Sequence, residues 1–349
     1  MSQRILVIVN PAAARARRAW PKVRARLGEN GLDFDVHETA FAGDATRATR
    51  EALRAGYNTV AVVGGDGTLS EAVAGFFDFE EDEQSNQLIM PTPVSPDAAL
   101  AILPAGTGDD FARGLAGKRE PVEEWVRRLI AHARDGDSKQ SRPVDVIAGR
   151  ATSANGWRSF ICLNVSTIGL GAEVAVRVAG QGRFVQRLPG EARFLKAACQ
   201  ALLMWRERRM RVKVDESEAL ECASNLIAVA NNVYAGGGMM FAPEARTDDG
   251  LIDLMLSCKL TRRTIIRELP RIHRGGHINN PNVTLFKAKR VRLEPLSPGD
   301  SLPVEADGNP RGHTPAEFQI MPGALRIVTS KKQSAVSIQP SAKTSSSSC

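Results

Sequence analysis

Cysteine and aromatic residues are scarce in this chain. Its 349 residues include five cysteines, and Phe, Trp and Tyr together make up 5%. The cysteines form no Cys-x-x-Cys pair and none lies near a histidine in sequence, which argues against a zinc site or a disulfide scaffold and favours a reducing cytosol. Few aromatics, without interleaved basic residues, disfavour a nucleic-acid binder, because base stacking needs aromatic side chains.

Long apolar runs are also missing. The longest stretch without charge, residues 222–243, is interrupted by three asparagines and by Gly236-Gly237-Gly238. Unpaired amides and flexible backbone are costly in lipid, so we expect no transmembrane span there. Ile5–Val9 is too short for a signal peptide and predicts a strand. The sequence therefore predicts a cytoplasmic protein that touches a membrane only from its surface.

Basic residues exceed acidic ones. The formal net charge is +7, which favours anionic partners such as a nucleotide or an anionic lipid surface. The length predicts two domains, and 43% apolar residues suffice for real cores.

Strand and helix patterns alternate over residues 1–142. This alternation predicts an α/β nucleotide-binding domain with a parallel sheet and helices on both faces. The expected strands are 4–9, 34–38, 59–63 and 98–103, and the expected helices are 13–27, 45–55, 69–77 and 122–133. Residues 78–97 predict a surface loop, and 135–142 a linker.

Short strand patterns dominate after Pro143. They predict a β-rich, mostly antiparallel domain over residues 143–313, with helices at 184–209 and 261–274. The expected strands are 144–148, 159–165, 211–214, 225–230, 251–257, 283–286, 290–293 and 324–328. Residues 331–349 are rich in Ser, Lys and Gln and predict a disordered tail.

The most informative motif is Gly64-Gly65-Asp66-Gly67-Thr68. It follows the apolar run 59–63, and apolar residues at helical spacing come next. A strand, a glycine loop and a helix together can hold phosphates, because backbone N–H groups approach the anion closely and the helix N-terminus adds positive dipole. Asp66 adds a carboxylate that could face Mg²⁺ or a hydroxyl.

Four further clusters could carry chemistry. They are Asn10-Pro11, the loop 103–113 with Thr107 and a possible helix cap at Asp109, the run 236–253, and Val304–Asn309. Each taken alone is also compatible with an ordinary turn. Together they favour a site, since two phosphate-type loops share one α/β domain and carboxylates recur in the other.

These motifs together resemble the diacylglycerol kinase catalytic family of lipid kinases, which includes bacterial soluble enzymes and the sphingosine and ceramide kinases. The resemblance runs from Asn10 to about Val328. The Gly-Gly-Asp-Gly-Thr motif also occurs in NAD kinases and phosphofructokinases. Far more specific is its combination with two further motifs. These are Leu-Pro-x-Gly-Thr at Leu103 and Gly-Gly-Gly…Pro-x-Ala…Asp-Asp-Gly-x-x-Asp at Gly236.

The resemblance implies a two-domain kinase with ATP in the cleft between an α/β domain and a β-sandwich-like domain, and a lipid as acceptor. The segment 314–330 would return to the first domain. Asp307 matches the general base for the lipid hydroxyl, with Asp66 as the second catalytic residue. Asp249, with the backbone oxygens of Arg246 and Leu251, matches a structural Mg²⁺ site. The implied nucleotide contacts are Asn10, Thr39, Gly64, Gly65, Asp66, Gly67, Thr68, Leu69, Ser70, Thr107 and Asn309.

The chain departs from the family pattern at four places. Ala12–Ala14 replace the usual x-Ser-Gly, Asp109 stands for Asn, Ser70 for a frequent Asn, and Asn309 for a common acidic residue. The alanines weaken the phosphate-loop interpretation, and Asn309 removes a carboxylate. Two alternatives to a diacylglycerol kinase therefore stay open: an NAD kinase, and a nucleotide- or lipid-binding protein with degraded catalysis.

A basic amphipathic stretch, Arg183–Arg211, predicts peripheral binding to the inner membrane surface. The alternative is a solvated helix face over an apolar core. The sequence leaves open which lipid is the acceptor and whether the protein forms a homodimer.

Overall fold

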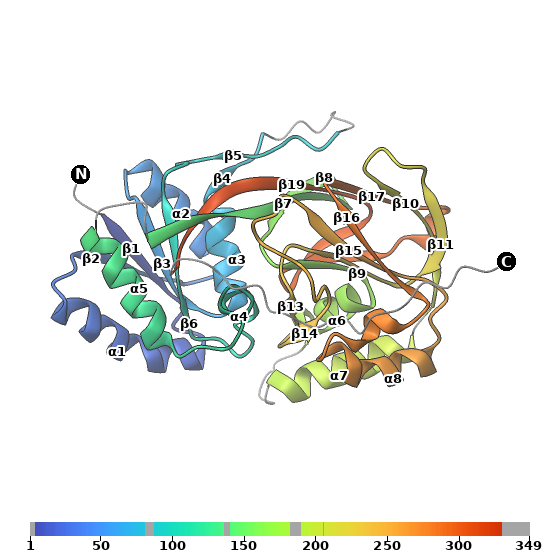
Figure 1. The fold of residues 1–349 in the computed structure, drawn as a ribbon, viewed down its shortest axis with the longest axis horizontal. Coiled ribbons are helices and arrows are strands. Elements are labelled where there is room, and N and C mark those ends of the chain that lie inside the picture. The colour runs from blue at the N-terminus through green and yellow to red at the C-terminus, as the bar shows by residue number, and fades with distance from the viewer. Residues whose placement is uncertain (1–3, 81–86, 136–139, 182–189, 205, 330–349) are drawn as a thin grey trace, which may run out of the picture.

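The computed structural model describes residues 4–80, 87–135, 140–181, 190–204 and 206–329. Figure 1 shows an α/β domain beside a β-sandwich-like domain, with β7 and β19 running through both. The chain is thus built as two domains, as the sequence predicts. Within the described residues, no helix is both long and apolar enough to cross a membrane.

The first domain alternates strands and helices. Its strands β1, β3 and β6 are buried because they are apolar and covered on both faces. The elements are β1 (Ile5–Val9), α1 (Ala14–Glu29), β2 (Phe34–Glu38), α2 (Asp44–Arg54), β3 (Thr59–Gly64), α3 (Asp66–Ala74), β4 (Phe77–Asp78), β5 (Thr92–Pro93), β6 (Ala99–Pro104), α4 (Asp110–Ala116) and α5 (Val122–Asp135).

The second domain is mostly antiparallel. Its elements are β7 (Ser141–Ser153), β8 (Gly156–Cys162), β9 (Val165–Gly169), α6 (Leu170–Ala179), α7 (Gly190–Leu203), β10 (Arg208–Val214), β11 (Leu220–Ser224), β12 (Leu226–Ala230), β13 (Tyr234–Ala235), β14 (Met239–Met240), β15 (Ile252–Ser257), α8 (Arg262–Ile272), η3 (Gly276–Asn279), β16 (Val283–Ala288), β17 (Arg290–Pro295), η4 (Pro298–Asp300), β18 (Pro303–Ala306) and β19 (Asn309–Val328).

One continuous sheet joins the two domains. Its main path runs β16-β15-β12-β9-β18-β19-β6-β3-β1-β2. The pairs β2-β1, β1-β3 and β3-β6 are parallel, and β19 adds its last residues, Arg326–Val328, parallel to β6. The end of β19 thus pairs with the sheet of the first domain. The domain boundary predicted at 142–143 falls inside β7, and the boundaries themselves stay predictions.

Several predicted elements have different bounds. The helix expected at 69–77 ends at Ala74, because Gly75 caps it and Phe77 pairs with Pro93 in a two-stranded ribbon. The strand expected at 159–165 is two strands, β8 and β9. The helix expected at 184–209 is shorter: the described part, α7, ends at Leu203, and Arg208 already belongs to β10. The predicted tail 331–349 lies outside the described residues.

Candidate active site

The carboxyl ends of the parallel strands gather the predicted nucleotide residues. Asn10 follows β1, Gly64-Gly65 ends β3, and Ala105-Gly106 follows β6. The Asn10 Nδ2 donates to Thr68 Oγ1 at 3.0 Å, which ties the β1 loop to the first turn of α3. This edge is where open α/β sheets bind ligands, so the fold places these motifs at one location.

The two glycine loops touch each other backbone to backbone. A Cβ built on Gly106 would lie 2.5 Å from the Gly65 Cα, and one built on Gly65 would lie 3.0 Å from the Gly106 Cα. A side chain at Gly106 would collide with the Gly65 backbone, and one at Gly65 would fit only if the Gly106 backbone moved by a few tenths of an ångström. A Cβ built on Gly67, in the first turn of α3, would meet nothing within 4 Å. The N–H groups of a first helical turn have no partner within the helix, so they suit phosphate binding.

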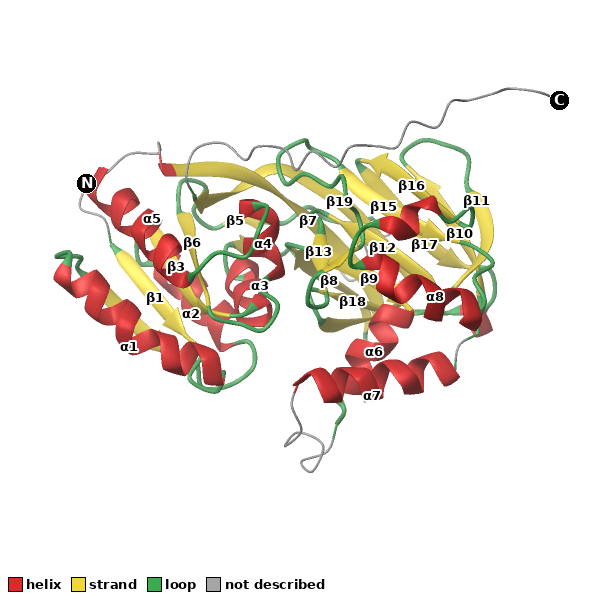
Figure 2. Cartoon of the chain, turned by 60° about the horizontal axis from the view of Figure 1, so that its bottom comes forward, coloured by secondary structure: helices red, strands yellow, loops and turns green. Residues whose placement is uncertain are grey.

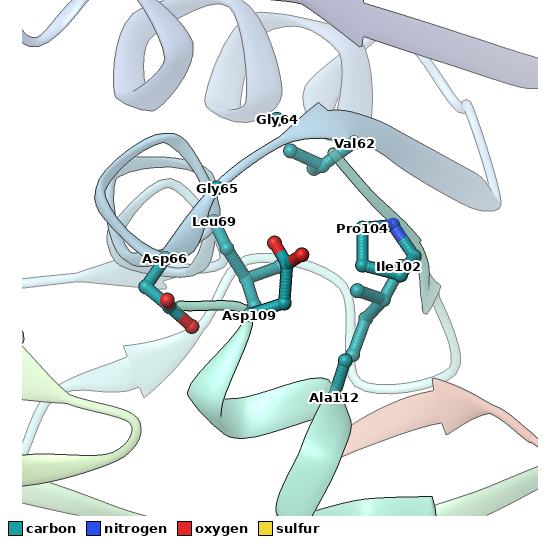
Figure 3. Close-up of a pocket in the computed structure, with 9 residues that line it drawn as sticks. All are labelled: Val62, Gly64, Gly65, Asp66, Leu69, Ile102, Pro104, Asp109 and Ala112. Atoms are coloured by element: carbon teal, nitrogen blue, oxygen red, sulfur yellow. The ribbon is translucent and has the colours of Figure 1, made fainter. Parts of the chain in front are cut away.

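A small pocket lies beneath these loops. Nine residues line it, among them Gly64, Gly65, Asp66 and Asp109, and its volume is about 10 Å³, the size of one water. Figure 3 shows the Asp109 carboxylate inside the pocket and Asp66 at its edge. This pocket is thus too small to hold a nucleotide.

Asp66 and Asp110 form a carboxylate pair beside the loops. A Cβ on Gly108 would lie 3.0 Å from Asp66 Oδ2 and 3.2 Å from Asp110 Oδ2, so both oxygens flank one point. Burial, followed by the negative charge of Asp110, raises the pKa of Asp66 to about 6. Burial also raises the pKa of Asp110. Among the described residues, Oδ1 of buried Asp110 has no hydrogen-bond partner.

These properties fit a divalent cation. Two neighbouring carboxylates in a low-dielectric site repel each other until a cation neutralises them, and Mg²⁺ prefers such oxygen ligands. The unpartnered Asp110 oxygen is available for this purpose.

Asp109 does not cap α4 with its side chain. Its backbone is in the left-handed region, with φ 52°. Its Oδ1 accepts from the Gly106 N–H at 2.7 Å and its Oδ2 from Arg119 at 3.0 Å. The carboxylate therefore folds back onto the glycine loop. The capping prediction for Asp109 is wrong.

Two arginines also reach this loop. Arg15 of α1 donates to the Gly106 carbonyl at 2.9 Å, and Arg119 donates to the Thr107 carbonyl at 2.8 Å. They bring positive charge to the glycine loop that follows β6.

Asp307 lies in the turn between β18 and β19 and accepts four hydrogen bonds. Its Oδ1 accepts from the Asn164 N–H at 2.8 Å and from the Cys162 thiol at 3.6 Å. Its Oδ2 accepts from the Leu163 N–H at 2.9 Å and from the Ser70 hydroxyl at 2.9 Å. An ionised carboxylate has about four acceptor positions, so all of them are occupied here.

The Ser70–Asp307 contact joins the two domains. Ser70 lies in α3, four residues after Asp66, and is buried. It was predicted as a nucleotide contact, whereas its hydroxyl faces the predicted base. Asp307 is therefore only one helical turn away from the glycine loop.

A buried network supports this junction. Asn232 donates to the Asp110 carbonyl at 3.2 Å and to Asn164 Oδ1 at 2.8 Å. Asp110 Oδ2 in turn accepts from the Gly237 N–H at 2.7 Å. Consequently the triple-glycine run and the loop after β6, far apart in sequence, hold the carboxylate pair in place.

Glu305 lies fully buried next to the Asp307 turn. It accepts from the Thr167 N–H at 2.9 Å and hydroxyl at 2.6 Å, and from the Gly308 N–H at 2.7 Å. Burial raises its pKa from 4.5 to about 7, and nearby Asp307 adds to the effect.

The raised pKa of Glu305 predicts a pH-dependent stability. Between pH 4.5 and 7 the Glu305 carboxyl keeps its proton in the folded chain but loses it in the unfolded chain. Its contribution to the free energy of unfolding is therefore complete below pH 4.5 and is lost as the pH rises through 7. Its full size is roughly 3 kcal/mol. Urea unfolding between pH 4.5 and 8 should show this decline, and Glu305→Gln should flatten it. Exposed Glu216→Gln is the control, and an equal slope in all three proteins would contradict the assignment.

The other predicted nucleotide residues differ in accessibility. Thr107 is exposed, and Thr39 is half-buried with its N–H bonded to the Val9 carbonyl. Leu69 is buried in the core and its N–H bonds to the Gly65 carbonyl, so it contributes packing. Gly67 is exposed at the start of α3. Asn309 donates to the Asp307 carbonyl at 3.3 Å and braces that turn.

The predicted structural metal site lies in a separate loop. Asp249 Oδ1 accepts from the Leu251 N–H at 3.2 Å, and its Oδ2 pairs with the Lys287 ammonium at 2.9 Å. Arg246 is exposed and pairs with Asp248. Asp249 thus already faces a cation from the chain itself.

Sequence reasoning did not single out Asp110, Glu305, Asn164 or Asn232. Asp110 and Glu305 lie inside predicted motifs, but the predicted roles in those motifs belong to other residues. The asparagines interrupt apolar strand patterns, and a polar residue at a core position was the available signal.

Strand-end glycine loops, two neighbouring carboxylates that suit a cation and a carboxylate of a second domain against the helix after the loop are the parts that a nucleotide-dependent phosphotransferase needs. Comparison with known families agrees. The Diacylglycerol kinase catalytic domain matches residues 4–147, and the YegS C-terminal NAD kinase beta sandwich-like domain matches residues 165–329. The chain belongs to the diacylglycerol kinase-like family of lipid kinases, as the motifs predict.

Its relatives carry lipid kinase names. It is 30% identical to the "Probable lipid kinase YegS-like" protein of Pseudomonas aeruginosa, covering 88% of this chain and 89% of the relative. It is 26% identical to the "Diacylglycerol kinase" of Bacillus subtilis, covering 95% and 98%.

Solved structures share the fold. A putative diacylglycerol kinase from Bacillus anthracis superposes with a TM-score of 0.67 at 20% identity, covering 94% of this chain and 98% of that one. Yeast NADH kinase superposes with a TM-score of 0.51 at 9% identity, covering 94% and 84%.

Proposed function

We propose that this lipid kinase transfers the γ-phosphate of ATP to the hydroxyl of diacylglycerol, giving phosphatidic acid. The observation that carries the proposal is the Ser70–Asp307 contact, which sets a carboxylate of the second domain one helical turn from the glycine loop. An acceptor hydroxyl at Asp307 would lie next to phosphates bound at the start of α3.

Asp66 and Asp110 would hold Mg²⁺, which would neutralise charge on the phosphates during transfer. The N–H groups at the start of α3 would orient the phosphate chain. Arg15 and Arg119 would add positive charge beside Gly106. These roles need only positioning and electrostatics, which are the main contributions to phosphoryl transfer.

Asp307 would accept the proton of the lipid hydroxyl. Since its acceptor positions are all occupied, one donor has to leave first. Leu163 and Asn164 donate from the backbone, and the Cys162 thiol makes a weak bond to Oδ1 at 3.6 Å. The Ser70 hydroxyl, on Oδ2, can rotate away about one side-chain bond. The lipid hydroxyl would therefore replace Ser70 at Asp307 Oδ2.

A radiolabelled-ATP assay tests the proposal. Purified protein with Mg²⁺ would be given diacylglycerol, a sphingoid base, ceramide, phosphatidylglycerol or NAD⁺ as acceptor. The proposal expects fastest labelling of diacylglycerol. If another lipid is labelled faster, that lipid is the substrate instead of diacylglycerol. Labelling of NAD⁺ would favour the NAD kinase alternative. ATP binding without any turnover would favour a binding protein with degraded catalysis.

Exposed apolar and basic side chains on α7 and α8 are the basis for membrane binding. Leu195 and Leu203 of α7 and Met204 directly after it are 64%, 72% and 70% exposed, and Ile266 and Leu269 of α8 are 56% and 47% exposed. The two helices lie together with α6 on one face of the second domain (Figure 2), and Ile265 and Leu202 share one cluster beneath them. Exposed arginines accompany them at positions 262, 263, 267, 271 and 274.

We call these exposed residues of α7 and α8 the α7–α8 face, and we propose that it docks on anionic lipid. Part of the predicted basic stretch, residues 183–189 and 205, lies outside the described residues. The described part retains Lys196, Arg206 and Arg209 as exposed cations. Docking through this face does not depend on a homodimer, which stays a prediction.

Vesicle sedimentation tests this docking. Binding should rise with anionic lipid content and fall with salt, because charge attraction is screened over about 8 Å at physiological ionic strength. Arg263→Gln/Arg267→Gln should weaken binding about tenfold or more, at roughly 1 kcal/mol per charge. Ile266→Ser/Leu269→Ser should weaken it as well, whereas Leu220→Ser, an exposed change on β11, should not. Equal sedimentation with neutral and anionic vesicles at low salt would contradict the docking.

A further inference from the structure

Two carboxylates, one in the loop before β15 and one within β15, contact the same lysine. Lys287 lies opposite Asp253 in the register of β15 and β16. Its Nζ lies 3.3 Å from Asp253 Oδ2 and 2.9 Å from Asp249 Oδ2. The Asp253 side chain is 6% exposed and that of Asp249 is 19% exposed. A single ammonium thus bridges two carboxylates that have little access to water.

Unpaired carboxylates at these positions would be costly, because burial disfavours charge without a partner.

The loop before β15 also contacts the strands that connect the two domains. Asp145, at the start of β7, accepts from the Gly250 N–H and the Gly323 N–H, both at 2.7 Å. Through Asp145 the loop holds β7 and β19 together, so neutralising its charge affects the strands that connect the domains.

With the Lys287 ammonium in place, Asp249 does not suit Mg²⁺. Magnesium requires near-octahedral oxygen coordination at about 2.0–2.1 Å. Asp249 Oδ1 is used by the Leu251 N–H and Oδ2 by Lys287. A magnesium ion on Oδ2 would come within roughly 5 Å of the ammonium, where like charges repel.

We propose that Lys287 supplies the positive charge that a divalent cation would otherwise supply to this loop. The nucleotide-free protein then needs no structural metal at Asp249, and the loop becomes dependent on a divalent cation only when the ammonium is removed. This inference is independent of the kinase reaction, since it concerns the stability of the second domain without nucleotide or lipid.

Thermal unfolding of the full chain without nucleotide tests the proposal. Each protein is melted in EDTA and in millimolar MgCl₂. The parent and Asp249→Asn should show the same Mg²⁺ response, because any response from Asp66 and Asp110 is common to both. Lys287→Met should melt lower by roughly 2–6 °C in EDTA, and Mg²⁺ should restore part of that loss.

Two variants serve as controls. Lys287→Arg keeps the charge and should melt within about 2 °C of the parent. Lys289→Met removes an exposed charge two residues along the chain and should behave as the parent does. The inference is overturned if Mg²⁺ stabilises the parent but not Asp249→Asn, or if Lys287→Met melts like the parent. It is also overturned if Lys287→Met is destabilised without regaining stability in Mg²⁺, since the lysine would then be an ordinary ion pair.

Discussion

Asp307→Asn should lower kcat by about 10²–10⁴-fold, the usual contribution of a positioned general base. The amide keeps the size of the side chain but cannot take the proton of the lipid hydroxyl. Its NH₂ group would also face donors, the N–H of Leu163 or of Asn164, so stability should fall by about 1–3 kcal/mol. Steady-state kinetics with saturating ATP and a melting curve measure the two effects separately.

Ser70→Ala is the matched control for Asp307. It removes the contact between domains but leaves the carboxylate, and it frees the acceptor position that the lipid hydroxyl would take. Turnover should stay within about tenfold of the parent, since one hydrogen bond contributes about 1 kcal/mol. If Ser70→Ala loses as much turnover as Asp307→Asn, the pair serves to join the domains. If ATP affinity collapses in Asp307→Asn, Asp307 belongs to the nucleotide site.

Asp66→Asn should reduce kcat by roughly 10³-fold or more, comparable to removing a main electrostatic contact of a transition state. The asparagine can still accept from the Phe111 N–H, so the helix start is preserved. What disappears is the negative charge that, with Asp110, would bind Mg²⁺. The apparent affinity for Mg²⁺ in the ATP assay should fall together with kcat.

Asp109→Asn is the control for this change. It also removes one negative charge from the same cluster, but the two oxygens of Asp109 are held by the Gly106 N–H and by Arg119. Asparagine is moreover the usual residue of the family there. Its activity should stay within about tenfold of the parent. Near-normal turnover in a folded Asp66→Asn protein would refute the catalytic role of Asp66.

Local sequence signals predicted most of the first domain. Apolar runs of five or six residues gave β1, β3 and β6 nearly to the residue, because buried parallel strands are apolar throughout. Helix bounds were weaker where a glycine intervened: Phe76 and Phe77 continue the apolar spacing of α3, yet Gly75 ends the helix. Periodicity cannot detect such an end, whereas capping can.

Long-range partners could not be predicted. Ser70 and Asp307 are 237 residues apart, and nothing in either segment indicates the other. Lys287 looks like an ordinary exposed strand residue until β15 and β16 pair and set it opposite Asp253. The motifs identified the glycine loops and Asp307. They could not show which donors bond to each carboxylate, because that depends on sheet register and domain packing.

The strand β19 makes the two domains one mechanical unit. A flexible linker would let them rotate freely, but β7 and β19 run antiparallel to each other from one domain into the other, with an irregularity in register between Met321 and Leu325. Opening and closing around a lipid would then be bending at that irregularity, where Gly323 has a positive φ of 60°. Bending at this point permits small changes in the angle between the domains, whereas the paired strands resist twisting. The stiffness of the β7–β19 ribbon would then govern the distance between the glycine loop and Asp307.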